Sequence, residues 1–191
     1  MQPRIPRQPV QDQGGIHADD DAGLGAELAA VVAGARRRAV RDGDRQVDTA
    51  HLLHSLIEYD PEVRAVIGDA PQLARLLGYL VQRSIGYGLR WQGGVEDSGA
   101  PPAVPRTGVK GDGTWSPVAA VALEHARGRA RRRTSGRAEG TDLLAGLVLD
   151  PGSRAVEVLE RAGVAAGDLA LRIDGSGGVR DAETESRTSS R

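Results

Sequence analysis

The chain has 191 residues, a formal net charge of −1, no cysteine and no phenylalanine. Without cysteine it has no disulfide, no thiolate nucleophile and no cysteine-based zinc site, and a net charge near zero gives no overall field that would attract nucleic acid or an anionic membrane. Because only two tryptophans and three tyrosines are present, the core must consist of leucine, valine and alanine, whose small side chains suit closely packed helices.

A disordered lead is predicted for residues 1–23. They contain three prolines and the acidic run Asp19-Asp20-Asp21, a composition that buries too little apolar surface to fold alone. The start of the chain lacks the apolar core of a signal peptide, and no apolar stretch approaches the roughly 20 residues that span a bilayer. We therefore expect a cytoplasmic protein that does not contact membranes.

Helices are predicted over residues 24–42, 47–59, 62–68 and 71–86. The first carries apolar residues at spacings of three and four, which places them on one helix face: Leu28, Val31, Ala35 and Ala39. The fourth carries another apolar set: Leu73, Leu76, Leu77, Leu80 and Val81. Together these helices form a first helical unit over residues 24–85.

A linker is predicted for residues 86–114, which are rich in glycine and contain Pro101-Pro102. Within it, the stretch Gly108–Thr114 superficially resembles a phosphate-binding loop. It lacks the required Gly-x-x-x-x-Gly-Lys-Ser/Thr spacing, and no apolar strand precedes it. No nucleophile motif occurs elsewhere in the chain, so we expect no enzyme activity, no catalytic residue and no cofactor.

A second helical unit is predicted for residues 115–173, followed by a disordered tail over residues 174–191. Ser116 can cap a helix that begins at Pro117, and one apolar stripe is expected on it: Val118, Val121, Ala122, Ala126 and Ala130. A leucine-rich helix is predicted for residues 138–149, where Asp150-Pro151 stops it. A shorter helix then ends near Gly163.

The second unit repeats the first at an offset of 91 residues. The buried-type leucines Leu52, Leu53 and Leu56 correspond to Leu143, Leu144 and Leu147. Asp60-Pro61 likewise corresponds to Asp150-Pro151, one residue out of register. Neither copy alone can bury its apolar face, whereas the two together can, so we expect them to form one domain.

At these residues the chain resembles the N-terminal, substrate-recruiting domain of Clp chaperones. That family has a repeat in which a helix is followed by Gly-Thr-Glu-His and a leucine-rich helix. The resemblance implies an all-α fold, with two tandem pseudo-symmetric four-helix repeats forming one domain. It also implies a non-catalytic protein-binding module, here a stand-alone member without ATPase modules. Its expected partners are Clp subunits or degradation substrates, and its expected role is that of adaptor, competitor or decoy in Clp-dependent proteolysis.

The resemblance places the working surface in the groove between the repeats. The residues expected near that groove are Asp48, Ala50, His51, Thr141 and Asp142. In the family, a glutamate just before the motif histidine helps to recognise phosphoarginine on substrates. The aligned positions here are Ala50 and Thr141, so this recognition residue is missing from both copies. Asp48 and Asp142 are the nearest acidic substitutes.

Two other readings compete with the protein-binding one. His51, His54 and Glu58 share spacings that would place metal ligands on one helix face, but the family also has histidine at the first position, where it packs at a helix start. We therefore predict no metal. Arginines gather at 36–38 and between 127 and 137, and they are the basis of an alternative function as a nucleic-acid-associated regulatory protein. No aromatic residues interleave with them, and solvated helix ends are favoured.

The missing glutamates generate a prediction about ligand affinity. A charge-assisted hydrogen bond is worth roughly 1.5–3 kcal/mol, or about one to two decades of affinity. We expect free phosphoarginine to bind far more weakly here than to a family member that retains both glutamates, and Ala50→Glu with Thr141→Glu to restore part of the binding. Calorimetric titration of both forms measures this, and equally tight binding by the unmodified chain would contradict it.

Overall fold

The computed structural model describes residues 23–84, 96, 115–133 and 136–175, and the chain forms helices without strands over these ranges. The all-α prediction is therefore confirmed. The predicted lead, linker and tail lie almost wholly outside the described residues. In chain order the helices are α2 (Ala26–Asp42), α3 (Thr49–Tyr59), α4 (Pro61–Ile67), α5 (Ala70–Ser84), α6 (Pro117–Arg131), α7 (Gly140–Leu147) and α8 (Arg154–Arg161), and residues 166–175 are also helical.

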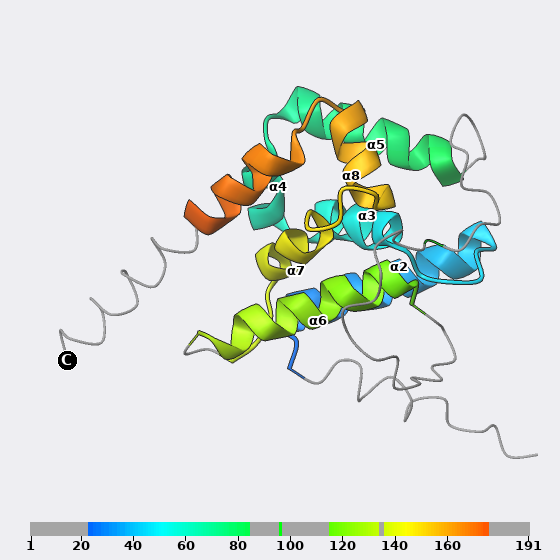
Figure 1. Ribbon diagram of the computed structural model, residues 1–191. Helices are drawn as coiled ribbons and strands as arrows, with labels where there is room; N and C mark the ends of the chain where they lie inside the picture. Colours follow the sequence, from blue (N-terminus) through cyan, green and yellow to red (C-terminus); the bar gives the residue numbers. More distant parts are fainter. Residues whose placement is uncertain (1–22, 85–95, 97–114, 134–135, 176–191) are drawn as a thin grey trace, which may run out of the picture.

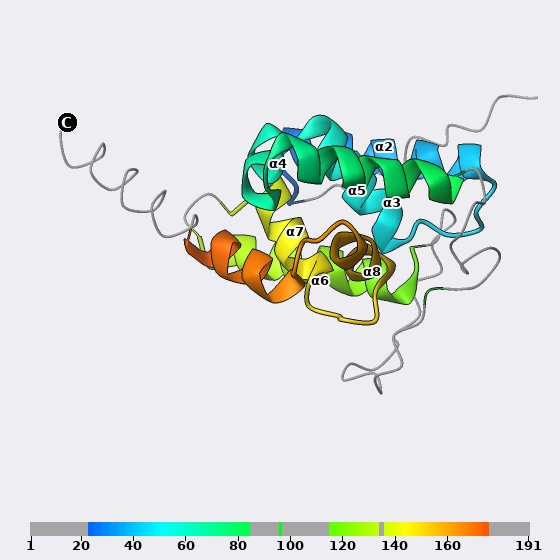
Figure 2. The same cartoon turned by 90° about the horizontal axis from the view of Figure 1, so that it is seen from above.

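Helices α3 and α7 occupy the middle of the fold. In Figure 1, α2 and α6 lie on one side of them, and α4, α5 and α8 lie on the other. Seen from above, α2 to α5 fill one half of the molecule and α6 to α8 the other (Figure 2). Residues 49–57 of α3 and every residue of α7 are buried, because neighbouring helices cover these two helices from several directions.

Helix starts follow the capping signals of the sequence. The Ser116 hydroxyl accepts a hydrogen bond from the backbone N–H of Ala119 at 3.1 Å, and Pro117 occupies the first helical position of α6. Ser153 caps α8 in the same way, at 3.2 Å from the N–H of Val156. The predicted start of α6 is therefore confirmed.

The predicted apolar stripe of α6 is wrong at one residue. Val121 is 62% exposed, whereas Ala119 and Leu123 are buried instead. The buried face follows steps of four from Val118 to Ala130 together with the neighbouring row that includes Ala119 and Leu123, so Val121 falls on the flank. The leucine-rich helix is also shorter than predicted: α7 ends at Leu147 and leaves Leu149 exposed.

Two isolated backbone bridges join the halves. Leu24 pairs with Ala138, and Val47 pairs with Trp115. The two bridges are equivalent by the 91-residue offset: Leu24 corresponds to Trp115, and Val47 corresponds to Ala138. The bridges place the start of α2 beside the start of α7, and the start of α6 beside the start of α3. Among the described helices, none combines the length and the apolar character that crossing a membrane requires.

His54 lies on α3 with 8% of its surface exposed. Burial, together with the nearby positive charges of Arg38 and Arg41, lowers the pKa of its imidazole from 6.5 to about 4. The folded protein therefore holds His54 neutral under conditions in which the unfolded chain binds a proton there.

The contact between α6 and α7 generates a prediction about packing. A side-chain Cβ at Gly146 would lie 2.4 Å from the carbonyl oxygen of Ala122, a backbone atom that cannot move aside freely. We expect Gly146→Ala to lower the free energy of unfolding by about 1–3 kcal/mol. Gly128→Ala, also within this helix pair but with open space around its Cβ, is the matched control and should be neutral or stabilising by about 0.5–1 kcal/mol. Urea unfolding compares the two, and equal effects would show that the close approach is absent.

His54 generates a prediction about pH. Its folded pKa lies below the unfolded value, so the unfolded chain takes up the extra proton as the pH falls from 6.5 towards about 4. Stability should fall through that window at a slope of at most about 1.4 kcal/mol per pH unit and should not change on this account above it. Thermal or urea unfolding at several pH values should show a shallower slope for His54→Gln than for the unmodified chain. Identical slopes would contradict the assignment.

Candidate functional site

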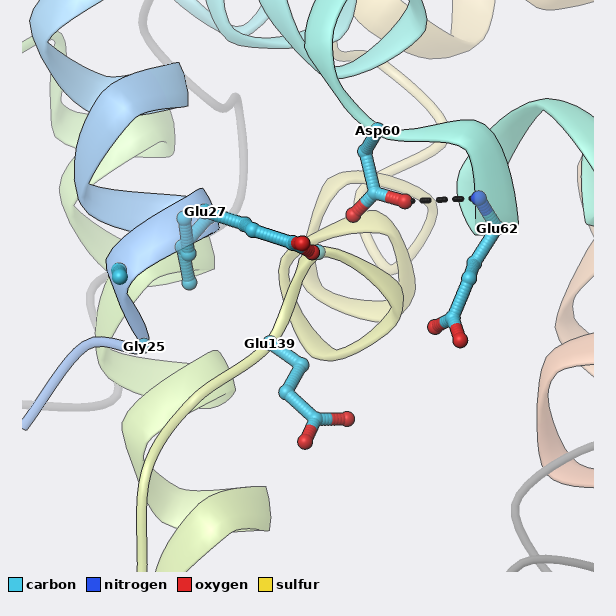
Figure 3. Close-up of a pocket in the computed structure, with 8 residues that line it drawn as sticks. Gly25, Glu27, Asp60, Glu62 and Glu139 are labelled. Carbon is cyan, nitrogen blue, oxygen red and sulfur yellow. Dashed lines mark hydrogen bonds between the residues drawn. The ribbon is translucent and has the colours of Figure 1, made fainter.

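An acidic pocket lies where α2, α4 and α7 begin. Its volume is about 260 Å³, and its lining comes from both halves of the chain. The residues that line it are Gly25, Ala26, Glu27, Leu28, Asp60, Glu62, Glu139 and Gly140. Figure 3 shows the side chain of Glu27 reaching from α2 towards Asp60 across the start of α7.

Asp60 forms one wall of the pocket, where hydrogen bonds hold its carboxylate in place. One oxygen of its carboxylate accepts hydrogen bonds from the backbone N–H groups of Glu62 at 2.9 Å and Val63 at 3.0 Å, which caps α4. The other oxygen packs against Gly140, where a Cβ would lie only 1.9 Å away. Glycine at the start of α7 therefore leaves room for the carboxylate, and Asp60 itself is 3% exposed.

The charge of the pocket favours a cationic group. Among the described residues that line it, four are acidic and none is basic. Arg133 approaches one of them from outside, with its Nη1 3.6 Å from the carboxylate of Glu139. The positive ends of three helices offset part of the acidic charge, yet four carboxylates exceed what these ends neutralise. The lining of the pocket therefore carries a net negative charge.

The residues expected near the groove are all buried. Ala50 and His51 are 0% exposed, Asp48 and Asp142 are 1% exposed, and Thr141 is 7% exposed. They lie in the first turns of α3 and α7 or, for Asp48, at the cap of α3. The structure brings Asp48 and His51 together in one cluster and places Asp142 in another.

Asp48 and His51 close the start of α3 reciprocally. The carboxylate of Asp48 accepts from the N–H of His51 at 2.9 Å, while the backbone N–H of Asp48 donates to Nδ1 of His51 at 3.1 Å. The second carboxylate oxygen of Asp48 pairs with Arg154 of α8 at 2.5 Å. This cap agrees with the expectation that the motif histidine packs at a helix start.

At the 91-residue offset Asp142 corresponds to His51, but its neighbours are basic instead of acidic. It accepts from the N–H of Glu139 at 3.0 Å and pairs with Arg129 and Arg133. His51 instead faces Asp44, whose carboxylate lies 3.2 Å from Nε2. Asp142 is therefore held among arginines at the start of α7, whereas His51 lies among carboxylates at the start of α3.

The histidine cluster differs from the one considered from sequence. Asp44, Asp48 and His51 offer ligand-type atoms within 4.8 Å of one another, whereas Glu58 pairs with Arg38. His54 and Glu58 thus take no part in this group. Because Asp48 is already engaged by Arg154 and by the cap of α3, the absence of a metal stays our prediction.

The arginine clusters meet acidic or aromatic groups of the same chain. Arg127 and Arg131 pair with Glu124, and Arg129 pairs with Asp174 as well as Asp142. The guanidinium of Arg36 lies over the ring of Trp115, 5.0 Å from its centroid. Much of the basic charge in these clusters is therefore neutralised or shielded internally.

Sequence reasoning missed the residues that form the acidic pocket. Asp60 precedes a proline and Glu62 follows it, which is a readable helix-start signal, but nothing in the sequence indicates that Glu27 and Glu139 join them. That meeting depends on the bridge between Leu24 and Ala138.

Comparison with solved structures identifies the fold. No protein-family model and no curated protein sequence matches the chain. The N-terminal domain of the caseinolytic-protease-associated chaperone ClpD from Arabidopsis thaliana superposes with a TM-score of 0.53 at 18% identity, covering 81% of this chain and 94% of that domain. A structure from work on a malarial protein secretion system superposes with a TM-score of 0.57 at 15% identity, covering 81% of this chain and 95% of the other. Similarity at such identities establishes the fold alone: this chain has the fold of the Clp chaperone N-terminal domain.

Proposed function

We propose that this chain is a non-catalytic protein-binding module whose acidic pocket receives a basic side chain of a protein partner. The observation that carries the proposal is the lining of the pocket, four of whose eight residues are carboxylates. An arginine fork or a lysine ammonium would find several acceptors there at once.

The size of the pocket supports a side chain as its ligand. Sites for drug-sized molecules typically enclose about 300–1,000 Å³, and this pocket encloses about 260 Å³. Its wall is set by the capped start of α4, so it does not need to form when the ligand arrives. A single arginine or lysine projecting from a peptide or a folded partner would be held by charge, with little rearrangement of the pocket.

The Clp-like fold supports a role beside Clp-dependent proteolysis. In this role the chain would be an adaptor, a competitor or a decoy, and it would bind Clp subunits or degradation substrates in the cytoplasm. The nucleic-acid alternative has weaker support, because several arginines on which it depends contact Glu124, Asp142 or Trp115 of the same chain.

Charge reversal in the pocket tests the proposal. Glu27 is exposed at the start of α2, so Glu27→Lys should leave the fold intact while placing a positive charge in the pocket. We expect the variant to bind its partner at least about tenfold more weakly than the unmodified chain, a loss of about 1.4 kcal/mol. Affinity capture from lysate of the source cell should therefore recover less of the partner with the variant. Calorimetry with the captured partner then measures the affinity directly.

The matched control is Glu160→Lys, which makes the same change on the exposed surface of α8 and outside the pocket lining. It should bind like the unmodified chain. If both variants retain the partner equally well, the acidic pocket is not the binding site. Loss of binding in both would indicate a general charge effect instead.

A further inference from the structure

At a second place in the fold, the N-terminal ends of three helices surround a carboxylate that belongs to the chain itself. Glu96 is 6% exposed and lies where α3, α6 and α8 begin. One of its carboxylate oxygens accepts from the N–H of Thr49 at 3.0 Å and from the hydroxyl of Ser116 at 2.7 Å. The other oxygen accepts from the N–H of Arg154 at 2.8 Å and from the hydroxyl of Thr49. We call these donors of Thr49, Ser116 and Arg154 the carboxylate cage.

The cage donors are oriented by the helices to which they belong. Thr49 and Arg154 are the first residues of α3 and α8, and N–H groups at that position have no acceptor within their own helix. The hydroxyl of Thr49 accepts from the N–H of Ala155 at 3.0 Å, and that of Ser116 accepts from the N–H of Ala119 at 3.1 Å. With these lone pairs engaged, both hydroxyl hydrogens are available to an oxyanion in the cage.

The acidic pocket lacks the two hydroxyl donors of the cage. At the 91-residue offset, Thr49 corresponds to Gly140 and Ser116 corresponds to Gly25, and glycine carries no hydroxyl. At the same offset Arg154 corresponds to Val63, whose N–H donates to the carboxylate of Asp60 at 3.0 Å. Backbone N–H donors to a carboxylate are therefore present at both junctions, and the cage differs by its two additional hydroxyl donors.

The two hydroxyls of the cage are oriented by hydrogen bonds that do not involve Glu96. Glu96 stands 47 residues from Thr49, 20 from Ser116 and 58 from Arg154 along the chain, and the hydrogen bonds that orient the two hydroxyls come from Ala119 and Ala155. Any carboxylate that reaches the cage would meet the same donors. We propose that the carboxylate cage is an exchangeable binding site for acidic side chains, which the chain fills with its own Glu96, and that an acidic peptide supplied in trans binds there when Glu96 is removed.

Exchange rests on competition between a tethered group and a free one. A carboxylate attached to the same chain has a high effective concentration at the site, so the unmodified protein should bind an external acidic peptide weakly. Removing the Glu96 carboxylate leaves buried donors without an acceptor, which penalises the empty cage. A ligand carboxylate restores those hydrogen bonds. This inference is independent of whether the acidic pocket binds a basic partner.

The experiment uses the full chain with Glu96→Ala, and Glu160→Ala as the control on an exposed site. We expect Glu96→Ala to lower the Tm by roughly 5 °C or more. Acetate, compared with chloride at the same ionic strength, should raise the Tm of this variant alone.

Peptide binding is measured by calorimetry on the Glu96→Ala protein. A synthetic peptide of residues 91–101 should bind it at least about tenfold more tightly than a peptide of the same residues in which Glu96 is replaced by Gln. If Glu96→Ala does not fold, the same titrations are made on full-length Glu96→Gln, whose amide cannot satisfy four donors.

Each outcome decides the proposal. A Tm of Glu96→Ala equal to that of the unmodified chain would show that Glu96 does not fill the cage. A lowered Tm with no response to acetate or peptide would show that Glu96 is a fixed structural contact and that the site does not exchange. Rescue of Glu96→Ala, with no effect on Glu160→Ala, supports the exchangeable site.

Discussion

Helix starts must satisfy backbone N–H groups that have no acceptor in their own helix, and the two bridges of this fold concentrate that requirement at two junctions. The bridge between Leu24 and Ala138 brings the starts of α2 and α7 together, and the bridge between Val47 and Trp115 does the same for α6 and α3. The positive helix ends and free N–H groups at such junctions attract carboxylates. At one junction Asp60 supplies the carboxylate from a helix cap, and at the other Glu96 supplies it from a distant part of the sequence.

The two junctions differ in the side chains that surround their carboxylates. Glycine at positions 25 and 140 removes hydroxyl donors and opens space, which leaves a pocket with an acidic lining. Threonine and serine at the aligned positions 49 and 116 close the other junction around a carboxylate. A similar reversal separates His51 from Asp142, whose surroundings are acidic and basic respectively. Side-chain differences at a few helix starts thus change what each junction can bind while the leucine core stays the same.

The fold was predictable because its signals are local. Leu52 and Leu143 mark central helices by their spacing, and Ser116-Pro117 marks a helix start by capping chemistry. The site was less predictable because its parts come together only through the packing of the two halves. Asp48 and Asp142 read as accessible acids in the sequence, yet both are buried by partners that are distant along the chain: Arg154 and Arg129. No local pattern distinguishes Glu96 from a solvated glutamate in a glycine-rich stretch, since its donors lie 20 to 58 residues away.

The contact between Arg36 and Trp115 gives the molecule an optical reporter. The guanidinium lies 5.0 Å from the indole centroid, and Trp115 adjoins Ser116, whose hydroxyl holds Glu96. Indole emission responds to nearby charge and to solvent access, so any rearrangement at this junction would be transmitted to the ring through the adjoining backbone. The chain contains only two tryptophans, so replacing Trp91 with phenylalanine would leave Trp115 as the single indole. Occupancy of the junction could then be followed in solution on the timescale of mixing, without an attached dye.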